Sequence, residues 1–220
     1  MDNAHILRHV DHTLLSPCAT WDEIDKLCGE SVKYETASVC VAPCYIKRIR
    51  AVYQKLVICG VVAFPLGHDT IAVKALATQM AIEDGADEVD MVINLTDVKN
   101  GDFAAVQTEI NMLKHIMEDR TLKVIIETCY LTEEEKIRLC KIVTDAGADY
   151  IKTSTGFGTA GATLHDIKLF KAHIGPNVKM KAAGGIRTRE DMVAYIEAGC
   201  SRLGTSSAIK ILAGEKAGAY

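Results

Sequence analysis

Three charged residues, Lys152, Lys181 and Asp90, stand in short apolar stretches of the sequence, where charged side chains are uncommon. Tyr150 and Ile151 precede the first of them and predict a strand, because aromatic and β-branched residues favour strands. Side chains alternate along a strand, so Lys152 points into the fold if Ile151 packs on the opposite face. A buried lysine is rare unless it is paired or used in chemistry. A solvated lysine on an edge strand is the alternative.

An amine and a carboxylate that face each other inside a fold have two interpretations. They can form a structural ion pair, which is weak evidence of function because burial costs desolvation. They can also be a nucleophile and its acid–base partner. The second lysine, Lys181, favours this interpretation, because burial and a nearby like charge both lower the pKa of an amine. A neutral amine attacks a carbonyl to form a Schiff base, and the cationic imine then draws electrons from a neighbouring carbon–carbon bond.

Glycine-rich turns surround the two lysines in the sequence. Gly156-Phe157-Gly158 and Gly184-Gly185 follow the two lysine strands, and Gly204-Thr205-Ser206-Ser207 leads into the last predicted helix. Backbone N–H groups in such turns and at helix N-termini attract phosphate. A single glycine pair is weak evidence, but three such turns beside two lysines predict a phosphate site.

Segments typical of strands and helices alternate along the chain. The predicted strands lie near 10–15 and over 37–42, 57–64, 88–94, 123–129, 150–154, 178–183 and 202–205. A predicted helix follows each strand, with Thr20 and Thr132 as two of the N-caps. This alternation predicts a parallel sheet. Eight units in 220 residues fit a closed α/β (β/α)8 TIM barrel in which residues 1–220 form one domain. An open doubly wound sheet is the alternative.

A repeated pattern sets the side-chain direction in three of the predicted strands. A helix-ending glycine stands five residues before Asp90, Lys152 and Gly204. These strands are the fourth, sixth and eighth, and alternate strands of such a barrel fill one interior layer. Asp90 and Lys152 should therefore share a layer, with open space beside Gly204 and Cys40 as the fourth member. The layer beneath should hold Glu88, Tyr150 and Arg202.

Composition narrows the class of protein. The chain is 49% hydrophobic and 25% charged with a net charge of −4, which is ordinary for a globular protein. Basic patches that would predict nucleic-acid binding are lacking, and the apolar stretches are too short to cross a membrane. We find no signal-peptide layout, so the eight cysteines are expected to be reduced thiols in a cytoplasmic protein. Cys40 and Cys44 have no companions at zinc spacing, so no metal site is expected.

Three segments, 88–94, 150–157 and 181–187, resemble the deoxyribose-phosphate aldolase family. The similarity extends from 11–15 to 204–207, which is nearly the whole chain, and the lysine strand is its most specific motif. The resemblance implies a barrel-shaped class I aldolase that uses no metal or cofactor. It also implies reversible cleavage of 2-deoxy-D-ribose 5-phosphate to acetaldehyde and D-glyceraldehyde 3-phosphate in deoxyribose phosphate catabolism. A homo-oligomer, dimer or tetramer, is expected.

The resemblance implies roles for individual residues. Lys152 forms the Schiff base, Asp90 donates and accepts protons, and Lys181 lowers the pKa of Lys152 and joins the proton relay. Some members of the family carry a lysine where this sequence has Phe157, so phosphate should depend on backbone donors and Arg187. The residues expected to line the phosphate site are Gly156, Gly184, Gly185, Gly204, Ser206 and Ser207.

Other functions stay open. The same imine could serve another sugar phosphate, a barrel isomerase or epimerase could use Asp90 without a covalent adduct, and a phosphate-binding protein could lack activity. His12 and His68 are expected to be structural, and Cys40 a plain buried thiol, although it could line the pocket. The tail 214–220 is expected to lack fixed structure, with closure over the site as the alternative.

Overall fold

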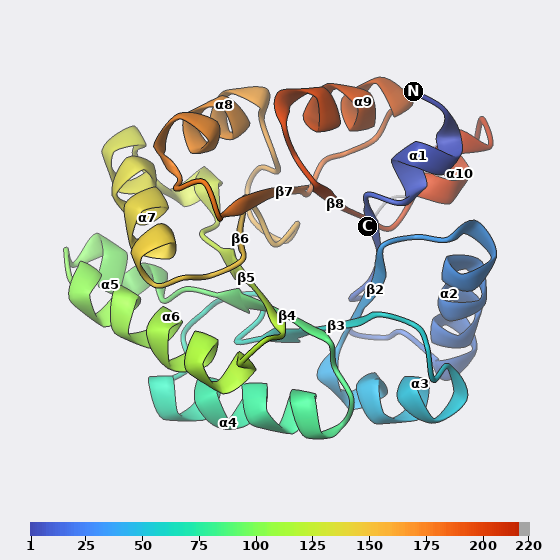
Figure 1. Ribbon diagram of the computed structural model, residues 1–220, viewed down its shortest axis with the longest axis horizontal. Helices are drawn as coiled ribbons and strands as arrows, with labels where there is room; N and C mark the ends of the chain where they lie inside the picture. The colour runs from blue at the N-terminus through green and yellow to red at the C-terminus, as the bar shows by residue number, and fades with distance from the viewer. Residues whose placement is uncertain (216–220) are drawn as a thin grey trace.

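The computed structural model describes residues 1–215, in which eight parallel strands close into a barrel (Figure 1). Each strand pairs with its neighbours in the chain, and β8 pairs with β1 to close the ring. The predicted (β/α)8 TIM barrel is confirmed. The expectation for the tail falls mainly on residues 216–220, outside the described part. The strands are β1 (Val10–Leu14), β2 (Ser38–Val41), β3 (Ile58–Val62), β4 (Glu88–Val92), β5 (Thr121–Ile125), β6 (Tyr150–Lys152), β7 (Lys179–Ala183) and β8 (Arg202–Thr205).

Helices form an outer ring around the strands, as Figure 1 shows. The short helices α1 and α5 were not predicted, and α1 packs against α9 and α10 beside the closing strands. The helices are α1 (Asn3–Leu7), α2 (Trp21–Tyr34), α3 (Ile46–Val52), α4 (Ile71–Glu83), α5 (Leu95–Lys99), α6 (Phe103–Met117), α7 (Glu133–Asp145), α8 (Leu164–His173), α9 (Arg189–Ala198) and α10 (Ala208–Leu212), with 3-10 turns η1 (Pro43–Tyr45) and η2 (Thr128–Tyr130).

The predicted N-caps Thr20 and Thr132 begin α2 and α7. Each hydroxyl accepts a hydrogen bond from the N–H three residues later, and the carboxylates of Glu23 and Glu135 accept from the cap N–H groups in return. Two donors at the start of each helix are satisfied in this way. The acidic first turn of α7 also complements the positive end of the helix dipole.

Several strands end earlier than predicted, among them β5 and β6. The strand predicted over 123–129 stops at Ile125, because Glu127 adopts a left-handed conformation (φ 51°, ψ 67°) and turns the chain into η2. The strand predicted over 150–154 stops at Lys152. Backbone pairing nevertheless continues past both ends, since the N–H groups of Ile126 and Thr128 donate to the carbonyls of Lys152 and Thr153.

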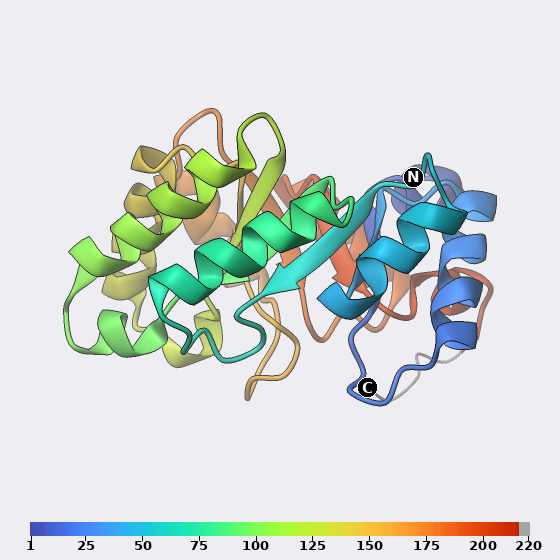
Figure 2. The ribbon, with the colours of Figure 1, turned by 90° about the horizontal axis from the view of Figure 1, so that it is seen from below.

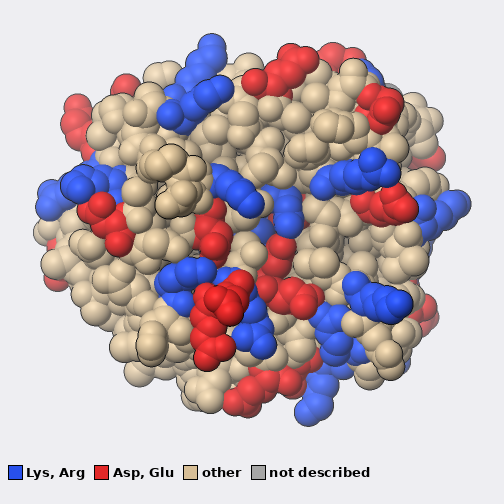
Figure 3. All heavy atoms as spheres, in the orientation of Figure 1, with Lys and Arg blue, Asp and Glu red and all other residues tan. Residues whose placement is uncertain are grey.

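The side view in Figure 2 shows the loops that follow the strands at the lower edge of the molecule, where the segment after β6 projects. Barrel enzymes place their chemistry at this end. On the face shown in Figure 3, Lys and Arg side chains are interspersed with Asp and Glu rather than gathered by sign. None of the helices within residues 1–215 has the length and apolar character needed to span a membrane.

Candidate active site

Lys152, Lys181 and Asp90 meet inside the barrel. The two lysines are register partners on β6 and β7, and Asp90 reaches them from β4. Lys152 Nζ and Lys181 Nζ each donate to Asp90 Oδ2 over 2.7 Å. Lys152 is 3% exposed, and the other two residues are completely buried. The predicted inward direction of these charges is confirmed, and a solvated edge lysine is excluded.

The predicted interior layer contains Asp90, Lys152 and Cys40. Lys152 donates a hydrogen bond to Asp90, and a carboxylate oxygen of Asp90 lies within 4.8 Å of Cys40 Sγ. The prediction of open space beside Gly204 is wrong. A Cβ on Gly204 would lie 2.9 Å from Ala183 Cβ and 3.2 Å from Lys181 Cε. The missing side chain therefore makes room for the stem of Lys181 on the neighbouring strand.

The layer beneath is as predicted. Arg202 donates to both carboxylate oxygens of Glu88, over 2.8 and 3.0 Å. Its guanidinium carbon also lies 5.8 Å from the centroid of the Tyr150 ring. This bidentate ion pair lies beneath the layer that contains Asp90 and Lys152.

Two buried charged residues that the sequence analysis did not single out, Asp11 and Lys123, complete the cluster. Asp11 on β1 forms an ion pair with Lys181. Lys123 on β5 lies 2.9 Å from Asp90 Oδ1 and 2.6 Å from Glu88 Oε2. Lys181 and Lys123 therefore hold different oxygens of the Asp90 carboxylate.

A weak sequence signal pointed to Lys123. It stands between Leu122 and Val124, so in a strand it faces away from both of them. The first and fifth strands lack the helix-ending glycine pattern that set the direction of Asp90 and Lys152. Their register was therefore not predictable from the internal repeat.

The ion-paired cluster around Asp90 holds one more cation than it holds carboxylates. Asp11 and Glu88 pair with these cations and reduce the excess of positive charge to a single charge. A neutral Lys152 would leave the remaining charges balanced. The cationic side chains are Lys123, Lys152, Lys181 and Arg202, and the carboxylates are Asp11, Glu88 and Asp90.

The ion pairs fix the charge states of Asp90, Lys181 and Lys123. Burial raises the pKa of Asp90, but the surrounding ammonium groups outweigh burial and hold this pKa well below its usual range. Burial lowers the pKa of Lys181 and of Lys123, yet their carboxylate partners raise both pKa values above the ordinary value. These three side chains are therefore ionised at neutral pH.

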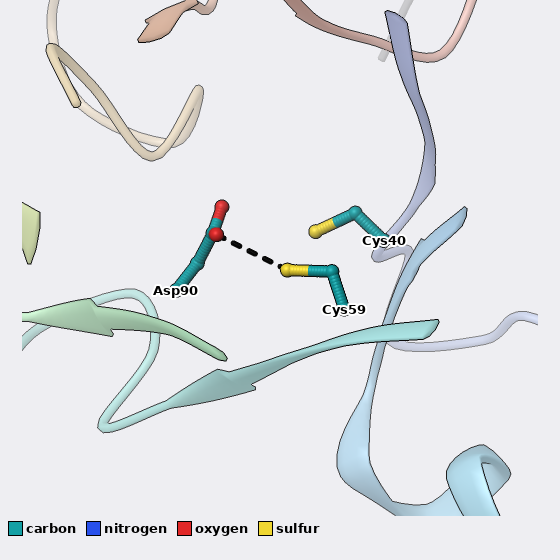
Figure 4. Close-up of side chains that lie close together, drawn as sticks. All are labelled: Cys40, Cys59 and Asp90. Atoms are coloured by element: carbon teal, nitrogen blue, oxygen red, sulfur yellow. Dashed lines mark hydrogen bonds between the residues drawn. The ribbon is translucent and has the colours of Figure 1, made fainter. Parts of the chain in front are cut away.

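Cys40 and Cys59 lie beside Asp90 in the barrel, as Figure 4 shows. Cys59 Sγ donates to Asp90 Oδ1 over 3.1 Å and accepts from Lys123 Nζ over 3.2 Å. The three candidate ligand atoms lie within 4.8 Å of one another, which is compatible with a metal ion. However, the ammonium groups around the carboxylate would repel a cation. We therefore assign these thiols to the hydrogen-bond network.

A cavity of about 160 Å³ opens where β6, β7 and β8 end. Arg187 contributes a cationic side chain to its wall, as expected. Gly184 and Gly185 both have positive φ, 80° and 73°, which other residues adopt only with strain. All the residues predicted for the phosphate site line this cavity, namely Gly156, Gly184, Gly185, Gly204, Ser206 and Ser207.

Phe157 lines this cavity and also a larger, mostly apolar cavity of about 520 Å³. Its ring packs edge-on against Phe64, with 5.5 Å between the ring centroids. Leu66 and Tyr130 add apolar surface to the larger cavity. An aromatic wall therefore stands between the two cavities, at the position where the resemblance had suggested a lysine in other proteins.

Comparison with known proteins decides the family of the chain. A family model described as "DeoC/LacD family aldolase" matches residues 6–214. The chain belongs to the DeoC/LacD aldolase family. It is 62% identical to deoxyribose-phosphate aldolase of Clostridium botulinum strain Eklund 17B, with 100% of each chain covered. It is 55% identical to deoxyribose-phosphate aldolase of Clostridioides difficile strain 630, over 96% of this chain and 97% of the relative.

The fold of this aldolase is also similar to solved structures. The tetrameric deoxyribose phosphate aldolase from Aeropyrum pernix superposes with a TM-score of 0.87 at 31% sequence identity. The match covers 97% of this chain and 92% of that chain. The similarity therefore extends over nearly the whole chain.

The two histidines differ in their surroundings in this aldolase. His12 on β1 is buried, and its Nε2 lies 3.0 Å from a carboxylate oxygen of Glu30 on α2. This contact agrees with the expected structural role. His68 lines the larger cavity.

Glu127 is a further buried acid of this aldolase that the sequence analysis overlooked. It lies just beyond β5 and lines the larger cavity. The residue is 2% exposed, and its carboxylate accepts hydrogen bonds from the backbone and the hydroxyl of Thr155. Burial raises its pKa, although the Thr155 hydrogen bonds oppose that rise. An isolated glutamate after an apolar strand gives no sequence signal for such a position.

Proposed function

We propose that this aldolase reversibly cleaves 2-deoxy-D-ribose 5-phosphate to acetaldehyde and D-glyceraldehyde 3-phosphate through a Schiff base on Lys152. The names of the relatives at 62% and 55% identity support this substrate. The observation that carries the mechanism is that the ion-paired cluster holds one surplus cation and that Lys152 must share its carboxylate, Asp90, with Lys123 and Lys181. The neutral amine of Lys152 is the nucleophile that attack on an aldehyde requires.

In the first step, the Lys152 nitrogen attacks C1 of the open-chain sugar, and water leaves as the C=N bond forms. The cationic imine accepts the electrons of the C2–C3 bond while a base removes the proton of the C3 hydroxyl. D-glyceraldehyde 3-phosphate leaves, and an enamine remains. Protonation of the enamine at C2 and hydrolysis of the imine release acetaldehyde and the free lysine.

Asp90 is assigned to proton transfer, with a water molecule as carrier. In the resting cluster it is a weak base, because ammonium groups hold its pKa well below the usual range. One of these groups is Lys152 itself. When Lys152 becomes neutral, Asp90 loses that stabilisation and becomes a better proton acceptor.

Lys181 is assigned to two tasks in the proposed mechanism. Its permanent charge, 2.7 Å from the oxygen that also holds Lys152, opposes a second ammonium at the same carboxylate. It also belongs to the hydrogen-bonded path for protons. Its second partner, Asp11, keeps it ionised and oriented.

The phosphate group is assigned to the cavity of about 160 Å³. Its volume suits a small anionic group, and its glycine turns supply backbone donors. Arg187 supplies the compensating charge. The sugar carbons would then lie between this cavity and the buried lysine.

A panel of sugar phosphates tests the proposal, with acetaldehyde release as the readout. Release from 2-deoxy-D-ribose 5-phosphate, abolished in K152R because guanidinium stays protonated, is the expected result. Acetaldehyde from a different sugar phosphate alone would indicate a related lyase. Isomerisation without cleavage would indicate a barrel isomerase or epimerase and would contradict the proposal.

Assembly and location are part of the proposal. The tetramer of the Aeropyrum pernix enzyme supports an assembly of identical chains, which light scattering of the purified protein would measure. We also propose that the enzyme acts in the cytoplasm. Fractionation of the source cells would test that location.

A further inference from the structure

Glu127 combines burial, a carboxylate and an unusual backbone conformation. Its φ and ψ of 51° and 67° fall in the left-handed region, which a residue with a side chain seldom occupies. Such an outlier persists only where the surroundings hold it, and it is a reason to look for a function. The conformation carries the chain out of β5 and directs the Glu127 side chain toward Thr155 in the segment after β6.

The carboxylate of Glu127 holds Thr155 at several points. The Thr155 N–H lies 3.2 Å from each carboxylate oxygen, and the Thr155 hydroxyl donates to one of them. The same hydroxyl accepts from the Phe157 N–H over 3.0 Å. Glu127 therefore fixes both the backbone and the side chain at the start of this turn.

The surroundings leave little freedom to the glutamate or to the turn. A Cβ on Gly158 would lie 3.2 Å from the Glu127 carboxyl carbon and 2.8 Å from Cys129 Sγ, so the turn packs directly on the acid. A Cβ on Gly184 would lie 3.3 Å from Gly156 Cα. Gly156, which follows Thr155 directly, therefore contacts Gly184 in the next glycine turn of the proposed phosphate cavity.

We propose that Glu127 is a positioning residue that holds the turn after β6 through Thr155 and so sets the phosphate preference of the enzyme. The inference rests on the proposed function. Glu127 borders the larger cavity, whereas Thr155 lines both cavities. Glu127 therefore acts on the phosphate site through Thr155 rather than by contact with phosphate, which its negative charge would repel.

The test compares 2-deoxy-D-ribose 5-phosphate with unphosphorylated 2-deoxy-D-ribose as substrates for E127A, E127Q and T155V. For E127A we expect KM for the phosphorylated sugar to rise about tenfold, with kcat changed less than about threefold. The kcat/KM for the unphosphorylated sugar should stay within about twofold of the wild type. E127Q keeps an acceptor for the Thr155 N–H, so its effect should be intermediate.

Coupling between the two residues is a second prediction. The double variant E127A/T155V should raise KM for the phosphorylated sugar less than the product of the single effects, because both changes break the same contact. Multiplicative effects would overturn the inference. An equal loss of kcat for both substrates would also overturn it, because that pattern indicates a catalytic group or general misfolding.

E109Q is the matched control. Glu109 is equally buried, at 2% exposure, and also accepts a backbone N–H, but it lies on α6 beside Lys74. Its substitution should lower thermal stability and leave the preference between the two sugars unchanged. Loss of phosphate preference in E109Q as large as in E127A would show that any buried glutamate has this effect, and would overturn the inference.

Hydrogen–deuterium exchange separates failure of this inference from failure of the proposed function. E127A should increase exchange in residues 153–162 and leave β5 unchanged, whatever the enzyme cleaves. Unchanged exchange in 153–162 would overturn the positioning role even if the wild type cleaves the phosphorylated sugar. If exchange in 153–162 increases in E127A but the wild type cleaves neither sugar, the positioning role of Glu127 is supported and the proposed function is contradicted.

Discussion

Lys123 and Asp90 form a buried ion pair of 2.9 Å inside the barrel, and neither residue is exposed to solvent. Lys123 also contacts Glu88, and its carboxylate partners raise its pKa. Without Lys123, the buried carboxylates of Asp90 and Glu88 would have one positive charge fewer to offset their own charge. We expect K123M to lower the free energy of unfolding by about 3–5 kcal/mol, as measured by urea unfolding at neutral pH.

Lys152 should behave differently from Lys123, because within residues 1–215 it forms an ion pair with Asp90 alone, whereas Lys123 lies beside Asp11, Glu88 and Asp90. Without Lys152, Asp90 keeps its ion pairs with Lys123 and Lys181. K152M should therefore lower the free energy of unfolding by less than K123M does in the same experiment. A loss as large as that of K123M would show that the folded protein depends on a charged Lys152 beside Asp90, contrary to the proposed mechanism.

Stability at acid pH tests the state of Asp90. Because its pKa is depressed in the folded protein, its contribution to stability is complete above the unfolded-state pKa of about 3.9. That contribution is lost as the pH falls through the lower, folded-state pKa. The difference in unfolding free energy between wild type and D90N should be constant from about pH 5 to 8 and shrink below about pH 4. A difference that already shrinks between neutrality and pH 5 would contradict a depressed pKa.

The phosphate site can be strengthened at position 157. F157K places an ammonium beside the cavity, where we expect KM for 2-deoxy-D-ribose 5-phosphate to fall up to about tenfold at low salt. The gain should diminish as salt is added, and KM for 2-deoxy-D-ribose should not change. Loss of the ring contact with Phe64 should cost about 0.5–1.5 kcal/mol of stability. F157L is the control; an equal fall in its KM would exclude a charge effect.

The barrel was predictable because its signals are local. Alternating strand and helix patterns, together with caps such as Thr20 and Thr132, indicated the order of elements. The strand ends were less predictable. The left-handed turn at Glu127 depends on partners in the segment after β6, which lies far along the chain.

The centre of the site was predictable only where the chain repeats itself. The glycine pattern before Asp90 and Lys152 fixed the direction of both side chains, and the structure places them in contact. Asp11 and Lys123 lie on strands without that pattern, so their part in the charge balance emerged only from the folded barrel. At Gly204 the same pattern led to a wrong prediction, because side chains of the neighbouring strand β7 fill the space beside this glycine.

Substitution of the nucleophile separates its charge from its chemistry. K152R keeps a positive charge near Asp90 but has no neutral form at accessible pH. We expect it to fold and to show no cleavage above the buffer rate in a coupled assay for acetaldehyde. Measurable turnover by K152R would rule out an imine on this residue.

Borohydride trapping tests the central claim most directly. The enzyme is incubated with acetaldehyde and sodium borohydride, digested, and analysed by peptide mass spectrometry. We expect an ethyl group on Lys152, with Lys123 and Lys181 unmodified because ion pairs keep both of them protonated. An adduct on either of these lysines instead of Lys152, or cleavage without any reducible adduct, would contradict the mechanism.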